Sequence, residues 1–248
     1  MSDPFHLQGK EVLVIGATSQ IGTAIASAVV SYGGRVFLCG RSEEKLTALS
    51  ISLGPSVLGT SLFDYQNVEA VRDFIKKMPV CNALLFAGGS VPRLMPFRLT
   101  DDRGSEEIMK ANFSAPASFL REILHARMLS DGASCVFINS VAAGGSPEAT
   151  AYYSAAKAAL LSLLRSVGGE YARRKMRFNS VAYGYLRGET IERLRVAEDR
   201  LALAPLGVPM PAEVVGAPLF LLSDASRWIT RKTFVVDGGV NLKQHWTI

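Results

Sequence analysis

The chain has 248 residues, of which 48% are hydrophobic and 20% are charged, and its net charge is +5. This composition excludes an intrinsically disordered chain, and the length suits one large domain. The start of the chain lacks a basic segment followed by a long apolar one, and no apolar run reaches about 18 uncharged residues, so we expect neither a signal peptide nor a membrane span. The excess of positive charge is small for this length, so we expect no nucleic-acid partner.

The three cysteines, Cys39, Cys81 and Cys135, are far apart in the chain and lie in or beside apolar runs. Their spacing is not that of a metal site, and we predict no bound metal. Buried free thiols suit a reducing compartment, so the sequence predicts a cytoplasmic protein.

Short β-rich runs alternate with helix-like runs along the chain. Strands are predicted at 11–16, 35–40, 56–62, 83–89, 134–140, 177–184 and 233–239. Helices are predicted at 21–33, 42–54, 67–79, 104–129, 152–172, 188–200 and 212–223. This alternation is typical of a doubly wound parallel sheet, so we predict a Rossmann-type α/β fold of about seven strands, with residues 1–248 in a single domain.

A glycine-containing turn follows the first predicted strand. Gly16 and Gly22 let the backbone turn sharply and let a pyrophosphate approach the N-terminus of the next helix. The spacing is not the common G-x-G-x-x-G fingerprint, so the turn alone is a weak signal. Its position at the first strand–helix junction of an alternating chain favours a dinucleotide site.

The second predicted strand ends without an acidic residue. Gly40 stands where NAD-binding folds place the Asp or Glu that binds the ribose 2′-hydroxyl, and Arg41 follows it. A guanidinium can pair with a 2′-phosphate through two hydrogen bonds. The sequence therefore predicts NADP(H) as the cofactor, and the alternative is an arginine that only faces solvent.

Two tyrosines and one lysine stand in the apolar run AYYSAAKAALLSLL, from residue 151 to 164. Tyr153 and Lys157 are four residues apart and share one face of a helix. An ammonium beside the phenol is expected to lower the pKa of Tyr153 from its usual value of about 10, which would let the tyrosine exchange a proton with an alcohol or carbonyl. Tyr152 lies ~100° of helix rotation away and is predicted to pack or to line the substrate pocket.

Ser140 ends the fifth predicted strand, thirteen residues before Tyr153. Its hydroxyl can donate to the oxyanion that develops when a hydride attacks a carbonyl. Residues at the carboxyl ends of parallel strands share one edge of the sheet, where ligands of open α/β sheets bind. Five residues named for their motifs follow predicted strands in this way: Gly16, Arg41, Gly88, Ser140 and Tyr183.

The motifs together resemble the short-chain dehydrogenase/reductase family, from about Gly9 to Val240. The resemblance rests on the turn at 16–22, the Ala87–Gly88 turn, and the spacing of Ser140, Tyr153 and Lys157. It implies an NADPH-dependent oxidoreductase that interconverts a ketone and a secondary alcohol. Reduction is the favoured direction, as in 3-oxoacyl-carrier-protein reductases. It also implies a small-molecule or carrier-bound carbonyl substrate.

The resemblance implies a role for each matching residue. Ser140 polarises the carbonyl, Tyr153 is the proton donor, Lys157 tunes Tyr153 and holds ribose, and Asn112 supports a proton relay within a kinked helix. The alternative for Asn112 is a side chain that faces solvent. The implied cofactor contacts are Gly16, Thr18, Ser19, Gln20, Ile21, Arg41, Ser61, Leu62, Ala87, Gly88, Tyr153, Lys157, Gly184 and Leu186.

The chain departs from the family pattern at several positions. Ile15 replaces Thr, Gln20 the middle glycine, Leu85 and Phe86 two asparagines, Tyr183 a proline, Gly188 a threonine and Arg231 a glycine. An alternative function, an NADPH-binding regulator or sensor without turnover, is favoured by the departures at Ile15, Gln20, Phe86, Tyr183 and Arg231. The intact Ser140, Tyr153 and Lys157 favour catalysis. An enoyl reductase would need a tyrosine seven residues before the lysine, where Thr150 stands.

Residues 185–205 are predicted to form a lid over the substrate. Arginines in this lid and in the loop after the fourth strand suit an anionic substrate, although acidic residues alternate with them and favour a solvated helix. They are Arg187, Arg193, Arg195 and Arg200 in the lid, and Arg93 and Arg98 in the loop. Helices 104–129 and 152–172 are apolar on more than one face, which predicts a homodimer or homotetramer.

Overall fold

The computed structural model describes residues 3–91, 95–194, 196 and 198–240. Within these ranges seven strands form one parallel sheet in the order β3-β2-β1-β4-β5-β6-β7. The strands are β1 Glu11–Ile15, β2 Arg35–Gly40, β3 Val57–Leu62, β4 Cys81–Phe86, β5 Leu129–Ser140, β6 Arg177–Tyr183 and β7 Thr233–Val236. The predicted Rossmann-type fold is confirmed.

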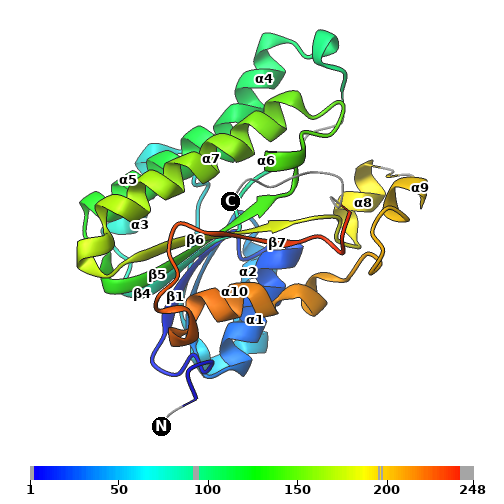
Figure 1. Cartoon of the computed structure of the whole chain (residues 1–248). Helices are drawn as coiled ribbons and strands as arrows, with labels where there is room; N and C mark the ends of the chain where they lie inside the picture. The colour runs from blue at the N-terminus through cyan, green and yellow to red at the C-terminus, as the bar shows by residue number, and fades with distance from the viewer. Residues whose placement is uncertain (1–2, 92–94, 195, 197, 241–248) are drawn as a thin grey trace.

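Helices cover both faces of the sheet (Figure 1). The helices α3, α5 and α7 pack on one face, and α1, α2 and α10 pack on the other. Their bounds, with those of the remaining α-helices, are α1 Gln20–Ser31, α2 Glu43–Leu53, α3 Val68–Ile75, α4 Asp102–Met109, α5 Ala115–His125, α6 Ala142–Gly145, α7 Ala151–Glu170, α8 Glu189–Leu194, α9 Glu198–Leu201 and α10 Gly216–Leu222.

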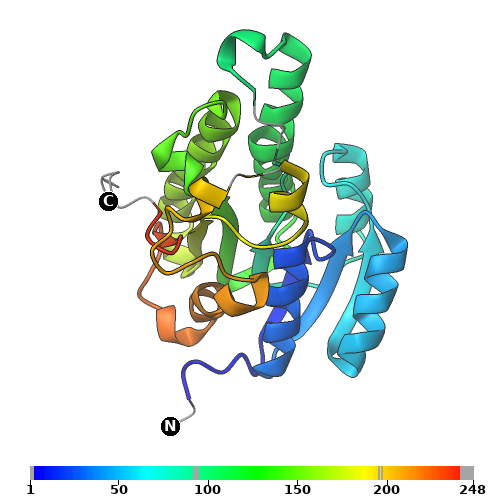
Figure 2. The ribbon, with the colours of Figure 1, turned by 90° about the vertical axis from the view of Figure 1, so that its right-hand side faces the viewer.

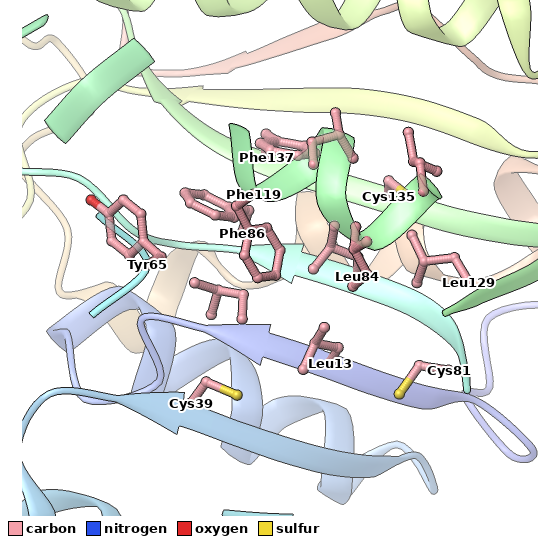
Figure 3. Packing of buried hydrophobic residues seen from close by; sticks show 14 of the residues in the cluster. Leu13, Cys39, Tyr65, Cys81, Leu84, Phe86, Phe119, Leu129, Cys135 and Phe137 are labelled. Carbon is pink, nitrogen blue, oxygen red and sulfur yellow. The ribbon is translucent and has the colours of Figure 1, made fainter. Parts of the chain in front are cut away.

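The central strands are apolar on both sides because helices cover both faces of the sheet. Leu13 and Leu84 face the α3–α5–α7 layer, whereas Val14 and Leu85 face the other layer. The centre of the first layer is aromatic. Phe86 stacks on Phe137 with ring centroids 5.2 Å apart, and Figure 3 shows these rings above β1 and β4.

The predicted helix at 104–129 is wrong at its C-terminal end. The helix α5 ends at His125, Arg127 has a left-handed φ of +55°, and Leu129 begins β5 by pairing with Cys81. The apolar residues near Leu129 suited either a helix or a strand. Pairing of Leu129 with β4 makes this segment a strand. The predicted helix at 188–200 is two short helices, α8 and α9, and the short helix α6 was not predicted.

The strands all point to one end of the sheet, where α6, α8 and α9 lie, and Figure 2 shows the molecule from that end. The strand order reverses between β1 and β4, and ligands of doubly wound sheets bind beside such a reversal. Over the part of the chain that the structure describes, no helix is long and apolar enough to cross a membrane.

Candidate active site

The turn after β1 brings the ends of β1 and β4 together. Gly16 has a φ of +79°, and a Cβ there would lie 2.7 Å from the carbonyl oxygen of Ala87. Ser19 caps α1, since its Oγ accepts from the Gly22 amide at 3.1 Å and donates to the Gly16 carbonyl at 2.8 Å. The N-terminus of α1 therefore lies in a compact turn, as anion binding at a helix N-terminus requires.

A cleft of about 470 Å³ opens beside this turn. Six of the predicted cofactor residues line it, namely Gly16, Thr18, Ser19, Arg41, Ala87 and Gly88. Ser42, Lys45, Phe63 and Tyr65 line it as well and were not predicted. A larger hollow of about 650 Å³ lies between α3 and α5 and holds none of the predicted site residues.

Two cations at the mouth of the cleft face acidic partners. Arg41 Nη1 lies 3.7 Å from Asp64 Oδ2, and Lys45 Nζ lies 3.8 Å from Glu189 Oε1. All four side chains are partly or largely exposed, so each pair contributes only about 0–1 kcal/mol. Both cations are thus available to an anion. The signal for Lys45 in the sequence is its place in the first turn of the helix that follows Arg41.

Ser61 and Leu62 do not line the cleft. They end β3, where Ser61 pairs with Cys39 in the sheet and the Leu62 side chain is exposed. β3 is the edge strand of the sheet, and the residues just after it, Phe63 and Tyr65, line the cleft instead. Tyr65 donates its hydroxyl to the Ala111 carbonyl at 3.0 Å, and burial raises its pKa to about 12.

Ser140, Tyr153 and Lys157 come together between the end of β5 and α7. Lys157 Nζ lies 5.8 Å from the centre of the Tyr153 ring, and Ser140 lies close enough to Tyr153 to lower its pKa. Both α7 side chains are buried. Tyr152, in contrast, packs against Phe97 with ring centroids 5.7 Å apart, as its different helix face predicted.

The expected lowering of the Tyr153 pKa is wrong. Burial raises the pKa of Tyr153 to about 12, against a smaller lowering by the nearby Ser140 hydroxyl. Burial also lowers the pKa of Lys157 to about 8, because removing an ammonium from water disfavours its charged form. Sequence spacing could place the two groups together but could not show that desolvation outweighs their attraction.

Asn112 is buried rather than facing solvent. It lies in a π-helical turn, Lys110–Ser114, which joins α4 to α5. Its amide donates to the carbonyls of Ser90 at 2.9 Å and Ile108 at 3.1 Å. A Cβ at Gly89 would lie 3.0 Å from Asn112 Oδ1 and 3.3 Å from Lys157 Nζ, so both side chains face the same glycine.

Asn139 was missed by the sequence reasoning, although it directly precedes Ser140. It is buried, its Nδ2 donates to the Lys157 carbonyl at 3.2 Å, and its Oδ1 accepts from the Ser140 amide at 2.7 Å. The signal in the sequence was a polar residue directly after the apolar run 135–138. Within the described ranges, no group of His, Cys, Asp or Glu could hold a metal ion.

The remaining predicted positions lie in the loop after β6 and in the first turn of α1. Gly184 approaches the backbone of Asp237, to which a Cβ would come within 2.9 Å. Leu186 packs against the core on the α1–α2–α10 side, as does Ile21. Gln20, the first residue of α1, is exposed and reaches toward Gly188.

Comparisons with known proteins identify the family. A model described as enoyl-(acyl carrier protein) reductase matches residues 16–241. The chain belongs to the short-chain dehydrogenase/reductase family. It is 29% identical to a 3-oxoacyl-(acyl-carrier-protein) reductase of Rickettsia felis, with 94% of this chain and 98% of that protein covered. It is 30% identical to a galactitol 2-dehydrogenase of Cereibacter sphaeroides, with 95% and 96% covered.

A solved structure agrees with this assignment. The fold matches an NADPH-bound short-chain oxidoreductase of Pseudomonas aeruginosa, described as having an atypical catalytic center, with a TM-score of 0.85 and 26% identity. The match covers 95% of this chain and 98% of that one. The predicted enzyme class, a short-chain oxidoreductase, is confirmed.

This short-chain dehydrogenase/reductase accommodates its departures from the family pattern by local packing. Phe86 joins an aromatic core, and the Tyr183 hydroxyl donates to the Val214 carbonyl at 2.8 Å. Arg231 has a φ of +65° and lies over Gly168 of α7, where a Cβ would come 2.7 Å from its Cγ. These replacements are compatible with the family's sheet.

The described arginines of the predicted lid, Arg187 and Arg200, differ in their surroundings. Arg187 donates from Nε to the Val208 carbonyl at 3.0 Å, and so ties the start of the lid to the chain just beyond its end. Arg98 and Arg200 are exposed. Arg93, Arg195 and the side chain of Arg193 lie outside the described part of the chain. The described arginines thus favour the solvated-helix interpretation.

Proposed function

We propose that this chain uses NADPH to reduce a ketone to a secondary alcohol. The observation that carries the proposal is the arrangement of polar groups along one edge of the sheet. Arg41 and Lys45 line the cleft beside the end of β2, and Ser19 at the α1 N-terminus lines it as well. Ser140, Tyr153 and Lys157 lie between the end of β5 and α7. The phosphate-bearing end of one dinucleotide would meet the cations Arg41 and Lys45. Its nicotinamide end would meet the catalytic side chains.

The glycines at this edge support the fit of a dinucleotide. A side chain at Gly16 would meet Ala87, and one at Gly89 would meet Asn112 and Lys157, so neither position has room for a side chain. Arg41 and Lys45 add positive charge for a 2′-phosphate, and Gly40 adds no carboxylate against it. The relative from Pseudomonas aeruginosa is itself described as NADPH-bound. The bound cofactor would supply a hydride.

The protein's own residues would then manage the proton. Ser140 donates to the carbonyl oxygen as negative charge develops there. A Tyr153 pKa of about 12 keeps the phenol protonated, as a proton donor in the reductive direction must be. Lys157, whose pKa is about 8, is still largely cationic at neutral pH and stabilises the phenolate that Tyr153 leaves behind. Asn112 and Lys157 both face Gly89, which places Asn112 beside the proton path.

Carbonyl reduction is favoured over enoyl reduction by the residue at 150. Thr150 has no phenol, and its hydroxyl is bonded to the Pro147 carbonyl and to Ser154. The substrate belongs to a class that the relatives span, from carrier-bound 3-oxoacyl groups to sugar alcohols. The segment 185–205 is the candidate lid, because α8, α9 and their small apolar cluster lie beyond the strand ends.

We also propose that the chain forms a homodimer or homotetramer and that it is cytoplasmic. The helices α5 and α7 lie side by side on one face, and α7 exposes small residues such as Ala155 and Ser162, which allow close helix contact with a second copy. Three buried free cysteines support a reducing, cytoplasmic setting.

The test is NADPH oxidation with a panel of ketones that includes 3-oxoacyl thioesters and ketoses. Turnover should fall by about 10²-fold or more in Tyr153→Phe, while NADPH affinity is kept. Tyr152→Phe is the matched control and should retain most of the activity. NADPH binding without turnover of any ketone, equal in wild type and Tyr153→Phe, would instead favour the regulator.

A further inference from the structure

The carboxamide of Gln20 lies against Gly188, although the two residues are far apart in the sequence. Gln20 is the first residue of α1, and its side chain is exposed. A Cβ added to Gly188 would lie 2.3 Å from Gln20 Nε2 and 2.8 Å from Gln20 Oε1. The amide therefore occupies the space that any side chain at position 188 would need.

Gly188 belongs to a braced segment rather than a free loop. Next to it, the Arg187 amide donates to the Pro209 carbonyl at 2.9 Å, and Arg187 Nε donates to the Val208 carbonyl at 3.0 Å. The Gly188 carbonyl accepts from the Ile191 amide at 3.0 Å at the start of α8. The Gln20 side chain thus meets a fixed surface at the base of the lid.

The same carboxamide lies at the N-terminus of α1, next to the capping residue Ser19. Backbone N–H groups and the helix dipole favour an anion at such a terminus. A glutamine amide adds two N–H donors. Held against Gly188, these donors lie between the α1 N-terminus and the base of the lid, and the neighbouring Ser19 lines the cleft.

We propose that the Gln20 side chain binds the diphosphate of the cofactor, and that Gly188 is a glycine because it must admit that side chain. The inference rests on the proposed function, since the diphosphate is that of NADP(H). Gln20 and Gly188 form a matched pair. The Gln20 side chain from α1 takes the place of the threonine side chain that the family has at position 188. Lys45, which lines the cleft, lies 3.8 Å from Glu189, the residue after Gly188. This ion pair is a second contact between the cleft and the base of the lid.

The test is calorimetric titration of four variants with NADPH and with 2′-phospho-ADP-ribose, which keeps the diphosphate but lacks nicotinamide. Gln20→Gly should weaken both ligands by about tenfold or more, as expected for a lost hydrogen bond to a charged group. Gln20→Glu should weaken them further, because it places a negative charge beside the diphosphate. Neither change should alter the melting temperature of the ligand-free protein by more than a few degrees, since the side chain is exposed.

Gly188→Ala separates the matched pair from a simple loss of one contact. It should cost about tenfold in affinity in the wild-type background, because the new Cβ displaces the amide, and about threefold or less in the Gln20→Gly background, where only the strain at a φ of +118° remains. Ser31→Gly, at the exposed far end of α1, controls for the effect of glycine on the helix.

Two results would overturn the inference. One is a Gln20→Gly variant that binds both ligands as tightly as wild type or more tightly, which would make the side chain a bystander or an obstruction. The other is a Gly188→Ala cost that is equal in both backgrounds. If wild type itself binds neither ligand, the proposed function fails, and this outcome is distinct from both.

Discussion

The side chain of Asn139 ties Ser140 to Lys157. Its Nδ2 donates to the Lys157 carbonyl at 3.2 Å, while its Oδ1 accepts from the Ser140 amide at 2.7 Å. One buried amide thus connects the end of β5 to α7. The relative position of the hydroxyl and the ammonium in the candidate site depends on this side chain as well as on the helix spacing.

Asn139→Ala should therefore slow turnover about tenfold to hundredfold, while the dissociation constant for NADPH stays within about threefold of wild type. The Ser140 amide loses its acceptor, and the tie to α7 is lost. Asn139→Asp keeps the acceptor but loses the donor. Its turnover should lie between those of wild type and Asn139→Ala. Steady-state kinetics with parallel NADPH titrations check this, and wild-type turnover in Asn139→Ala would refute the positioning role.

Arg41→Ala should weaken NADPH by about tenfold to hundredfold and NADH by less than about threefold, because only NADPH carries the 2′-phosphate that the guanidinium meets. Asp64→Asn should strengthen NADPH binding, since Asp64 faces Arg41 at 3.7 Å and competes with the phosphate. Calorimetry with both cofactors measures this. Arg103→Ala is the control, because Arg103 is an exposed arginine that pairs with Glu107 on α4. Equal losses for both cofactors would contradict the 2′-phosphate assignment.

Phe86→Ala should destabilise the protein by about 3–5 kcal/mol. The ring is fully buried, stacks on Phe137 at 5.2 Å and meets the edge of Tyr65 at 5.2 Å (Figure 3). Chemical denaturation measures the difference in the free energy of unfolding. Phe97→Ala, at a side chain that is 66% exposed, should cost less than about 1 kcal/mol. A similar cost at both positions would show that the aromatic core does not anchor the sheet.

Strand positions and strand ends could be predicted from the sequence, because buried parallel strands are short apolar runs bounded by turn residues. This placed Gly16, Arg41 and Ser140 on one edge. The end of α5 could not be predicted, since only pairing of Leu129 with Cys81 decides between helix and strand. The direction of the Gln20 side chain was also beyond the sequence.

The balance of forces on buried groups was the least accessible to sequence reasoning. The four-residue spacing of Tyr153 and Lys157 suggested that attraction controls the tyrosine pKa. The structure shows that burial controls it, and burial is a property of the whole fold. For the same reason Asn112 could be read as exposed or buried until the π-helical turn placed it in the interior.

Lys157 makes a prediction about stability and pH. Burial lowers its pKa to about 8 in the folded state, whereas its ordinary value is 10.5. Between these pH values the unfolded chain binds the extra proton, so this lysine opposes folding at neutral pH, and its penalty is relieved as the pH rises from about 8 toward 10.5. Lys157→Met should therefore be more stable than wild type at pH 7, by an amount on the order of 2–3 kcal/mol.

The difference between the two proteins, rather than either curve alone, is the quantity to measure. Burial raises the pKa of the three cysteine thiols, so their contribution to stability falls above about pH 9 in both proteins and cancels in the difference. Urea denaturation at several values between pH 7 and 9.5 should show the advantage of Lys157→Met shrinking steadily with pH. An advantage that is absent at pH 7, or that grows with pH, would mean that partners in the fold offset the desolvation of this ammonium.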